Sequence, residues 1–322
     1  MKKIGLIILL IVLMIGCNSN KTNQQNSIQM KKEQIHKNAA KPAGQKQMTE
    51  QEVKTKVAEN VKATVEAGQE KDSVAIKQAI EIIAQTGDAI KLINENKTDE
   101  AEKLMAKIVG ELEILMAKNP EVALIPVNVT YETRDLVVDI PTVYELTEAA
   151  QKAMDEGYYQ LARKILSDLA SEIVVKTTNL PLATYPDAMK LAVKLLSEGK
   201  KDEAMTVLIG ALNTLIVVEQ HIPLPVLRAE EYIKLAALVM EGDDKDKIEI
   251  AVNLLENADY QLKLAEALGY GKRDKEYKEL ADAIEALKKA IQEKQETKGM
   301  FEDLKKKIDA FKTRLFFNKS NG

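Results

Sequence analysis

A single cysteine, Cys17, is the residue whose type and position point most directly to chemistry. It follows Lys2, Lys3 and an apolar run, residues 4–15, that is too short to span a bilayer. This layout, with a glycine just before the cysteine, is typical of a lipoprotein secretion signal, and cleavage there would free the cysteine for lipidation. We therefore expect residues 1–16 to be a removed signal peptide and Cys17 to carry lipid. The alternative is an ordinary signal peptide with an accidental cysteine.

The expected lipid also sets the expected location. Asparagine rather than aspartate follows the cysteine, which favours the outer membrane. We expect a protein of the cell envelope that is anchored to the membrane and faces the periplasm. Residues 17–48 are rich in Asn, Gln, Lys and Ser, so they cannot bury enough apolar surface to become ordered. They predict a flexible polar tether.

Three side chains of the body could together hold an anionic ligand. Tyr185 follows one proline-containing loop, and His221 and Arg228 lie at the corresponding place in the next copy of a repeat. If both loops lie at one edge of the molecule, the three could bind a carboxylate or phosphate through charge-assisted hydrogen bonds. His221 could also sense acid, because histidine titrates near neutrality. The alternative is that Tyr185 is a packed ring and His221 an ordinary loop residue.

Other kinds of chemistry are not indicated. One cysteine and two histidines, His36 and His221, do not support a metal site. The sequence has no Gly-rich phosphate loop, nucleophile elbow or calcium-binding loop. Paired carboxylates such as Glu230 and Glu231 are adjacent rather than opposed across a cleft. We therefore expect no catalytic residues, no metal, no cofactor and no enzymatic activity.

The charge of the body argues against nucleic acid as a partner. Residues 51–270 contain 24 Lys and Arg against 38 Asp and Glu, a balance of −14. Binding to phosphate backbones requires clustered cations. We expect membrane contact through the anchor, and an exported protein client, a small molecule or a second copy of the chain as partner.

The body also repeats itself. The segments 156–166 and 198–208 are similar at an offset of 42 residues, 91–101 is an upstream copy, and a weaker fourth begins at Glu241. Each copy reads as an amphipathic helix, a polar turn and a second helix, which is the size class of tetratricopeptide and related repeats. The turns are expected at Asn96, Gly157, Gly199 and Gly242.

These features predict an all-α fold of stacked helical hairpins over residues 49–270. In each hairpin we expect a proline, such as Pro181 or Pro223, to stop the second helix, because proline lacks an N–H and clashes with the preceding turn. One β-like run, residues 125–131, is either an extended connector across the stack or a loop with fortuitous valine spacing.

The last segment, residues 271–322, predicts amphipathic helices. Its apolar residues recur every three or four positions, at Tyr277, Leu280, Ile284, Leu287 and Ile291 and again at Phe301, Leu304, Ile308, Phe311 and Leu315. This stripe either packs on the repeat body or forms a coiled-coil surface for a partner.

Part of the repeat body resembles the YfdX protein family. The resemblance is carried by the segments 178–186, 195–200, 202–204, 211–215 and 221–230, and extends more loosely over residues 70–290. It implies an all-helical, exported bacterial protein that is associated with stress responses and with chaperone-like or small-molecule binding. It implies no enzyme, and it supplies no catalytic residues. The expected lipid anchor departs from the secreted, soluble form of the family.

Two functions are compatible with these features. The first is a membrane-anchored, non-enzymatic binding or chaperone-like module that exposes apolar residues to a client. The second is a structural adaptor that self-associates or docks an envelope partner through its C-terminal helices.

Overall fold

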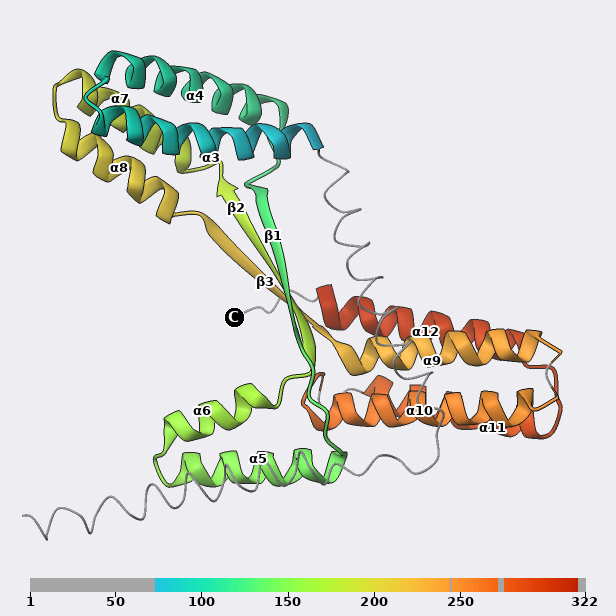
Figure 1. The fold of residues 1–322 in the computed structure, drawn as a ribbon. Coiled ribbons are helices and arrows are strands. Elements are labelled where there is room, and N and C mark those ends of the chain that lie inside the picture. The colour runs from blue at the N-terminus through green and yellow to red at the C-terminus, as the bar shows by residue number, and fades with distance from the viewer. Residues whose placement is uncertain (1–72, 244, 272–274, 318–322) are drawn as a thin grey trace, which may run out of the picture.

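The computed structural model describes residues 73–243, 245–271 and 275–317, and these are mostly helical with a small sheet (Figure 1). The helices are α3 (Ser73–Asn94), α4 (Thr98–Lys118), α5 (Ile140–Asp155), α6 (Tyr159–Asp168), α7 (Tyr185–Ser197), α8 (Lys201–Asn213), α9 (Leu224–Glu241), α10 (Lys247–Ala267), α11 (Lys275–Gln292) and α12 (Lys298–Phe317). The strands are β1 (Leu124–Arg134), β2 (Glu172–Pro181) and β3 (Ile216–Pro223). The predicted signal peptide, Cys17 and the tether lie outside the described residues.

The three strands form a narrow ribbon through the middle of the molecule. They are antiparallel in the order β1-β2-β3, with Val175 paired to Tyr131 on one side and to Gln220 on the other. Figure 1 shows the ribbon running between two helical bodies. Since β1 and β3 are the outer strands, each has one edge that pairs with no described strand.

The antiparallel strands place successive hairpins at alternating ends of the ribbon. β1 leads from the α3–α4 hairpin to the α5–α6 hairpin at the other end, β2 leads back to α7–α8, and β3 leads down again to α9–α10 (Figure 1). The expected helical hairpins are therefore confirmed, and the ribbon sorts them into two groups.

The first body consists of α3, α4, α7 and α8. It has its own apolar core, which also takes in the near ends of β1 and β2 through Ile125 and Leu180. Two alanines, Ala101 and Ala204, are fully buried at equivalent positions of their hairpins. Small residues at these positions let the paired helices approach closely.

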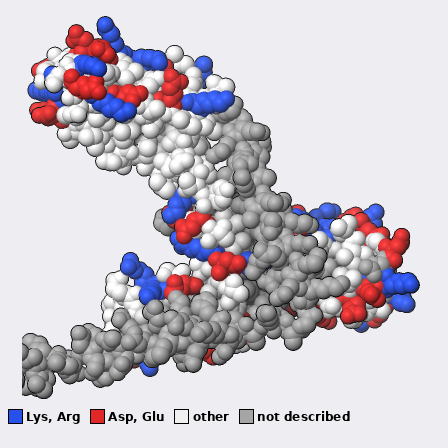
Figure 2. All heavy atoms as spheres, in the orientation of Figure 1, with Lys and Arg blue, Asp and Glu red and all other residues white. Residues whose placement is uncertain are grey.

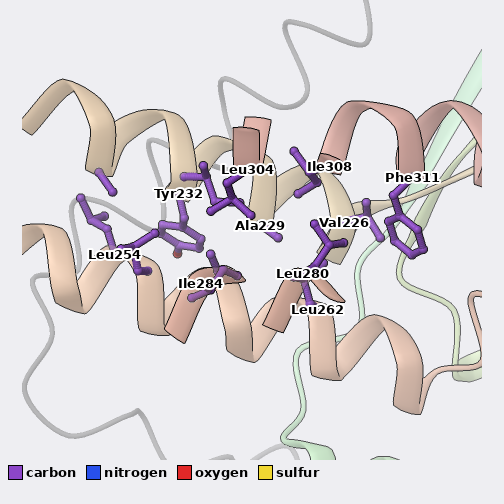
Figure 3. Packing of buried hydrophobic residues seen from close by; sticks show 14 of the residues in the cluster. Val226, Ala229, Tyr232, Leu254, Leu262, Leu280, Ile284, Leu304, Ile308 and Phe311 are labelled. Atoms are coloured by element: carbon purple, nitrogen blue, oxygen red, sulfur yellow. The ribbon is translucent and has the colours of Figure 1, made fainter. Parts of the chain in front are cut away.

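The second body consists of α9, α10, α11 and α12. Figure 3 shows Leu280, Ile284, Leu304 and Ile308 of the last two helices packed among side chains of α9 and α10. The ring of Tyr277 also meets the edge of Phe311 at 4.8 Å between centroids. The apolar stripe of the C-terminal segment is thus buried inside the chain.

Three of the four predicted turns have the expected backbone. Asn96, Gly157 and Gly199 have φ values of 61°, 80° and 76°, the left-handed conformation that closes a helix and favours Gly or Asn. Gly242 follows α9 with an extended backbone instead, at φ −79° and ψ 174°.

The expectation for the prolines was wrong. The second helices of the middle hairpins end at Asp168 and Asn213, well before Pro181 and Pro223, which end strands β2 and β3. Pro126 lies in the outer strand β1, where the pairing register shifts. Proline is tolerated at strand ends and on outer strands because no ladder hydrogen bond is lost there. The run 125–131 is thus an extended connector and not a loop.

Candidate functional site

Tyr185 lies in the core of the first body. Its ring begins α7, is completely shielded from solvent, and donates a hydrogen bond from its hydroxyl to Thr86 Oγ1 at 2.9 Å. Thr86 in turn donates to the carbonyl of Ile82 at 2.8 Å. Burial raises the pKa of Tyr185 to about 12. This tyrosine is a packed ring with a satisfied hydroxyl, as the alternative interpretation of the sequence had it.

His221 lies near the opposite end of the ribbon, where it meets the buried carboxylate of Glu172. Its Nδ1 is 3.0 Å from Glu172 Oε1, and the other oxygen accepts a hydrogen bond from the hydroxyl of Tyr270 at 3.0 Å. Tyr270, which follows α10, accepts from the backbone N–H of Ser171 at 3.0 Å. Burial, followed by the charge of Glu172, raises the pKa of Tyr270. Both Glu172 oxygens therefore have partners within the chain.

Arg228 joins the same network from the first turns of α9. Its Nη2 donates to Asp135 Oδ2 at 2.8 Å, and Asp135 Oδ1 is 3.4 Å from Ser171 Oγ. The Arg228 side chain is only 7% exposed, and within the described residues its Nε has no hydrogen-bond partner. A chain of contacts from Arg228 through Ser171 and Tyr270 thus reaches Glu172 and His221.

The structure therefore brings together two of the three candidate residues. His221 and Arg228 belong to one polar network, whereas Tyr185 is separated from it by the whole of β2, about 30 Å for ten residues at 3.3 Å each. The three do not meet at one edge, because β2 and β3 run in opposite directions. The carboxylates that His221 and Arg228 contact, Glu172 and Asp135, have further hydrogen-bond partners in the network. The network therefore ties the ribbon to α9 and to the end of α10.

One face of the ribbon is charged. Glu132 and Arg134 of β1 form an ion pair at 3.2 Å, and Lys176 of β2 pairs with Glu219 of β3 at 3.1 Å. The hydrogen bond and charge of Arg134 lower the pKa of Glu132. Cross-strand pairs of opposite charge support the register of neighbouring strands.

The far half of β3 has a different surface that the sequence analysis overlooked. Ile216, Val217 and Val218 are 41%, 55% and 48% exposed, although they are consecutive apolar residues on an outer strand. Their neighbours in β2 are Asn179, Thr178 and Thr177. The sequence did indicate an exposed apolar strand here. Ile216, Val217 and Val218 form a β-branched run, and no charged residue lies between Glu203 and Glu219.

This uncharged surface continues onto α8. Ile209 of α8 is 48% exposed. Figure 2 shows charged side chains gathered on the outer part of the first body and near the middle of the molecule. Few lie between them, where α8 leads into β3 (Figure 2). We call residues 209–218 the apolar edge.

The described residues include neither a metal-binding cluster nor a membrane-spanning helix. In the described part of the chain, no group of three or more His, Cys, Asp or Glu side chains is placed to hold a metal ion. Among the same residues, no helix has both the length and the apolarity that are needed to cross a membrane.

Residues 82–221 match the sequence profile of the YfdX protein family. Among solved structures, the chain is similar to Salmonella Typhi YfdX, with 20% sequence identity and a TM-score of 0.31 over 46% of this chain and 91% of that chain. No curated protein matches.

The matched residues begin within α3 and end at His221 in β3. They cover most of the ribbon and of the α3–α4 hairpin and all of the next two hairpins, whereas α9 to α12 follow them in the chain. The match over residues 82–221 confirms that this part of the chain resembles the YfdX family.

Proposed function

We propose that this protein is a non-enzymatic, chaperone-like binding protein of the cell envelope that holds an extended apolar segment of an exported polypeptide along β3. The observation that carries the proposal is the apolar edge, where Ile216, Val217 and Val218 stand exposed on an outer strand. The outer edge of such a strand presents unpaired backbone N–H and C=O groups, and an added strand satisfies them in series.

The side chains of the apolar edge define the class of segment that fits. Successive residues of a strand point to opposite faces, so Val217 and Val218 offer apolar contacts on both faces of an added strand. Glu219 and its ion pair with Lys176 mark the end of the uncharged stretch. We therefore expect a short, uncharged, β-branched segment to bind better than a charged one.

The C-terminal helices are a less suitable surface for this role. Their apolar residues, among them Leu287 and Phe311, are fully buried within the second body. Binding a partner through that stripe would require the second body to open. No observation favours the adaptor function over client binding at the apolar edge.

The location proposed for this activity is the periplasmic side of the membrane, with the chain held by lipid on Cys17. The support is the signal layout before that cysteine. Cys17→Ala should abolish incorporation of labelled palmitate and leave the precursor unprocessed. Unchanged labelling of the variant would refute the lipid anchor on Cys17, and the proposed binding role of β3 would remain.

The binding role is tested with a capped hexapeptide of alternating valine and threonine, which is uncharged and has high β propensity. Titration should show binding to the wild-type protein. Val218→Lys should weaken that binding at least tenfold, because a lysine on an outer strand opposes the addition of another strand. A peptide with proline at alternate positions should not bind, because proline cannot donate to a ladder.

Leu238→Lys is the matched control, since Leu238 is a 63% exposed apolar residue of α9, away from β3. It should bind the hexapeptide as the wild type does. Equal affinity of the wild type and Val218→Lys for the peptide would refute the proposal, provided both proteins show the same thermal unfolding midpoint.

A further inference from the structure

One hydrogen bond at the end of β3 shows which of its backbone groups point outward. The N–H of Leu224 donates to the carbonyl of Ser171 at 3.0 Å, and these two residues continue the register of β3 and β2. In antiparallel strands, hydrogen-bonded and non-hydrogen-bonded residue pairs alternate, so the even-numbered residues of β3 direct their N–H and C=O groups toward β2. The carbonyl of Ile216 agrees, because it accepts a hydrogen bond from the Asn179 side chain of β2 at 3.1 Å. The backbone groups of the odd-numbered residues therefore point away from β2.

An added strand would pair through its backbone with the odd-numbered residues Val217, Glu219 and His221. Antiparallel addition continues the pattern of the ribbon, and antiparallel pairing is the more stable kind per residue. In that direction, the client residue opposite Glu219 comes first in the added strand. The next three client residues then lie along the apolar edge, from Val218 to Ile216.

Glu219 is the charged residue that this first client residue meets. The Glu219 side chain is 43% exposed, and its Oε1 pairs at 3.1 Å with Lys176, the residue directly opposite it in β2. Its other oxygen, Oε2, is 3.8 Å from Nε2 of His221, which is longer than a hydrogen bond. Directly opposite residues of neighbouring strands carry their side chains on the same face. The first client residue therefore extends the row of Lys176 and Glu219 by one strand.

We infer that Glu219 selects a client segment with a lysine or arginine immediately before its β-branched run, bound antiparallel to β3, which rests on the proposed binding of an extended segment along this strand. The run itself stays uncharged, as residues 216–218 of β3 are. A client cation completes a row of alternating charge across three strands. A client carboxylate at the same position is repelled by Glu219, so the charge sets both the preferred client and its direction.

The expected preference is modest, because the pair lies at the surface. Opposite charges directly across two strands contribute about 0.2 to 1 kcal/mol, so a lysine before the run should tighten binding about two- to fivefold relative to glutamine. Glutamate should weaken binding by about the same factor, since like charges directly opposite are destabilising. In about 1 M salt, where the screening length is about 3 Å, the preference should largely disappear.

The test is calorimetric titration of the non-lipidated chain, residues 18–322, with capped heptapeptides in which lysine, glutamine or glutamate precedes the valine–threonine hexapeptide. The wild type should bind the lysine peptide best and the glutamate peptide worst. The double variant Lys176→Glu, Glu219→Lys should invert this order. It keeps an ion pair between β2 and β3 and the net charge of the protein, so an inverted order reports the position of the charge alone.

A second exchanged pair is the matched control. Glu198 and Lys200, between α7 and α8, form an exposed ion pair at 2.7 Å, and Glu198→Lys, Lys200→Glu should keep the wild-type order. Glu219→Gln is a milder variant that removes the charge without reversing it, and it should lose the preference for the lysine peptide. Equal thermal unfolding midpoints show that each variant is folded.

The outcomes separate the selected charge from the binding itself. Equal affinity of the wild type for all three heptapeptides would overturn the selection by Glu219 and leave the proposed function standing, whereas binding of none of them would overturn both. A wild-type order in the double variant would also overturn the role of Glu219. A hexapeptide with lysine at its C-terminal end should gain nothing over glutamine there. A gain confined to that peptide would overturn the antiparallel direction.

Discussion

Replacing Tyr185 by phenylalanine should have opposite effects on stability at neutral and at alkaline pH. At pH 7 the variant loses the hydrogen bond to Thr86, which costs about 1 kcal/mol. The loss is moderate because Thr86 keeps its own bond to Ile82. No cavity forms, since only the hydroxyl is removed.

At high pH the same hydroxyl lowers the stability of the folded protein. Burial raises the pKa of Tyr185 from 10 to about 12 in the folded protein. The folded state therefore holds this proton more tightly, so the stabilisation is fully present below pH 10 and is lost as the pH rises toward 12. By pH 11 the loss is about 1.4 kcal/mol, one pKa unit. Phenylalanine does not titrate, so the stability curves of the two proteins should cross near pH 11.

The assay is urea unfolding of both proteins at pH 7, 9, 10 and 11. Ionisation of Tyr270 and of other groups affects both proteins alike, so the difference between their free energies of unfolding isolates Tyr185. Thr86→Val is the companion variant and should cost about 1 to 3 kcal/mol at pH 7, because it leaves the buried hydroxyl of Tyr185 without an acceptor. A difference between wild type and Tyr185→Phe that is the same at every pH would refute the placement of this ring in the core.

Three further substitutions test other parts of the fold. Ala204→Leu should lower the free energy of unfolding by about 1 to 3 kcal/mol, because Ala204 is fully buried and the close helix contact has no room for extra methylenes. A variant that melts at the wild-type temperature would place Ala204 on the surface. Tyr270→Phe should lower the free energy of unfolding in urea by about 1.5 to 3 kcal/mol, because it removes the hydrogen bond that the Tyr270 hydroxyl donates to the buried Glu172 carboxylate. A loss below about 0.5 kcal/mol would count against that network. Phe311→Ala should cost about 3 to 5 kcal/mol, with a lower midpoint in thermal unfolding, whereas a neutral effect would mean that α12 does not pack on α9.

The hairpins could be predicted from the sequence because their signals are local. The left-handed turn residues Asn96, Gly157 and Gly199 and the helical spacing between them lie within each repeat. The repeat offset of 42 residues was correct, but it spans a strand as well as two helices. The strands pair residues that are about 40 to 60 positions apart in the sequence. Val174 and Val175 of β2 are both buried and Val217 and Val218 of β3 are both exposed, so neither strand shows the alternation that identifies a half-buried strand.

The prediction that the three candidate residues lie at one edge was wrong for a related reason. Tyr185 and Arg228 occupy corresponding positions at the start of α7 and of α9, which suggested that they would share an edge. Two consecutive antiparallel strands reverse the direction of the chain, so corresponding positions in neighbouring repeats lie at opposite ends of the ribbon. Glu172 was overlooked because an isolated acidic residue at a strand start carries no signal until its partners Tyr270 and His221 are known.

Hydrogen exchange of the backbone amides, with and without the valine–threonine hexapeptide, tests whether the outer edge of β3 takes up an extended apolar segment. Added peptide should slow exchange within residues 216–220 and leave the α5–α6 hairpin unchanged. Bound peptide without slower exchange in β3, or slower exchange confined to another part of the chain, would refute strand addition at β3.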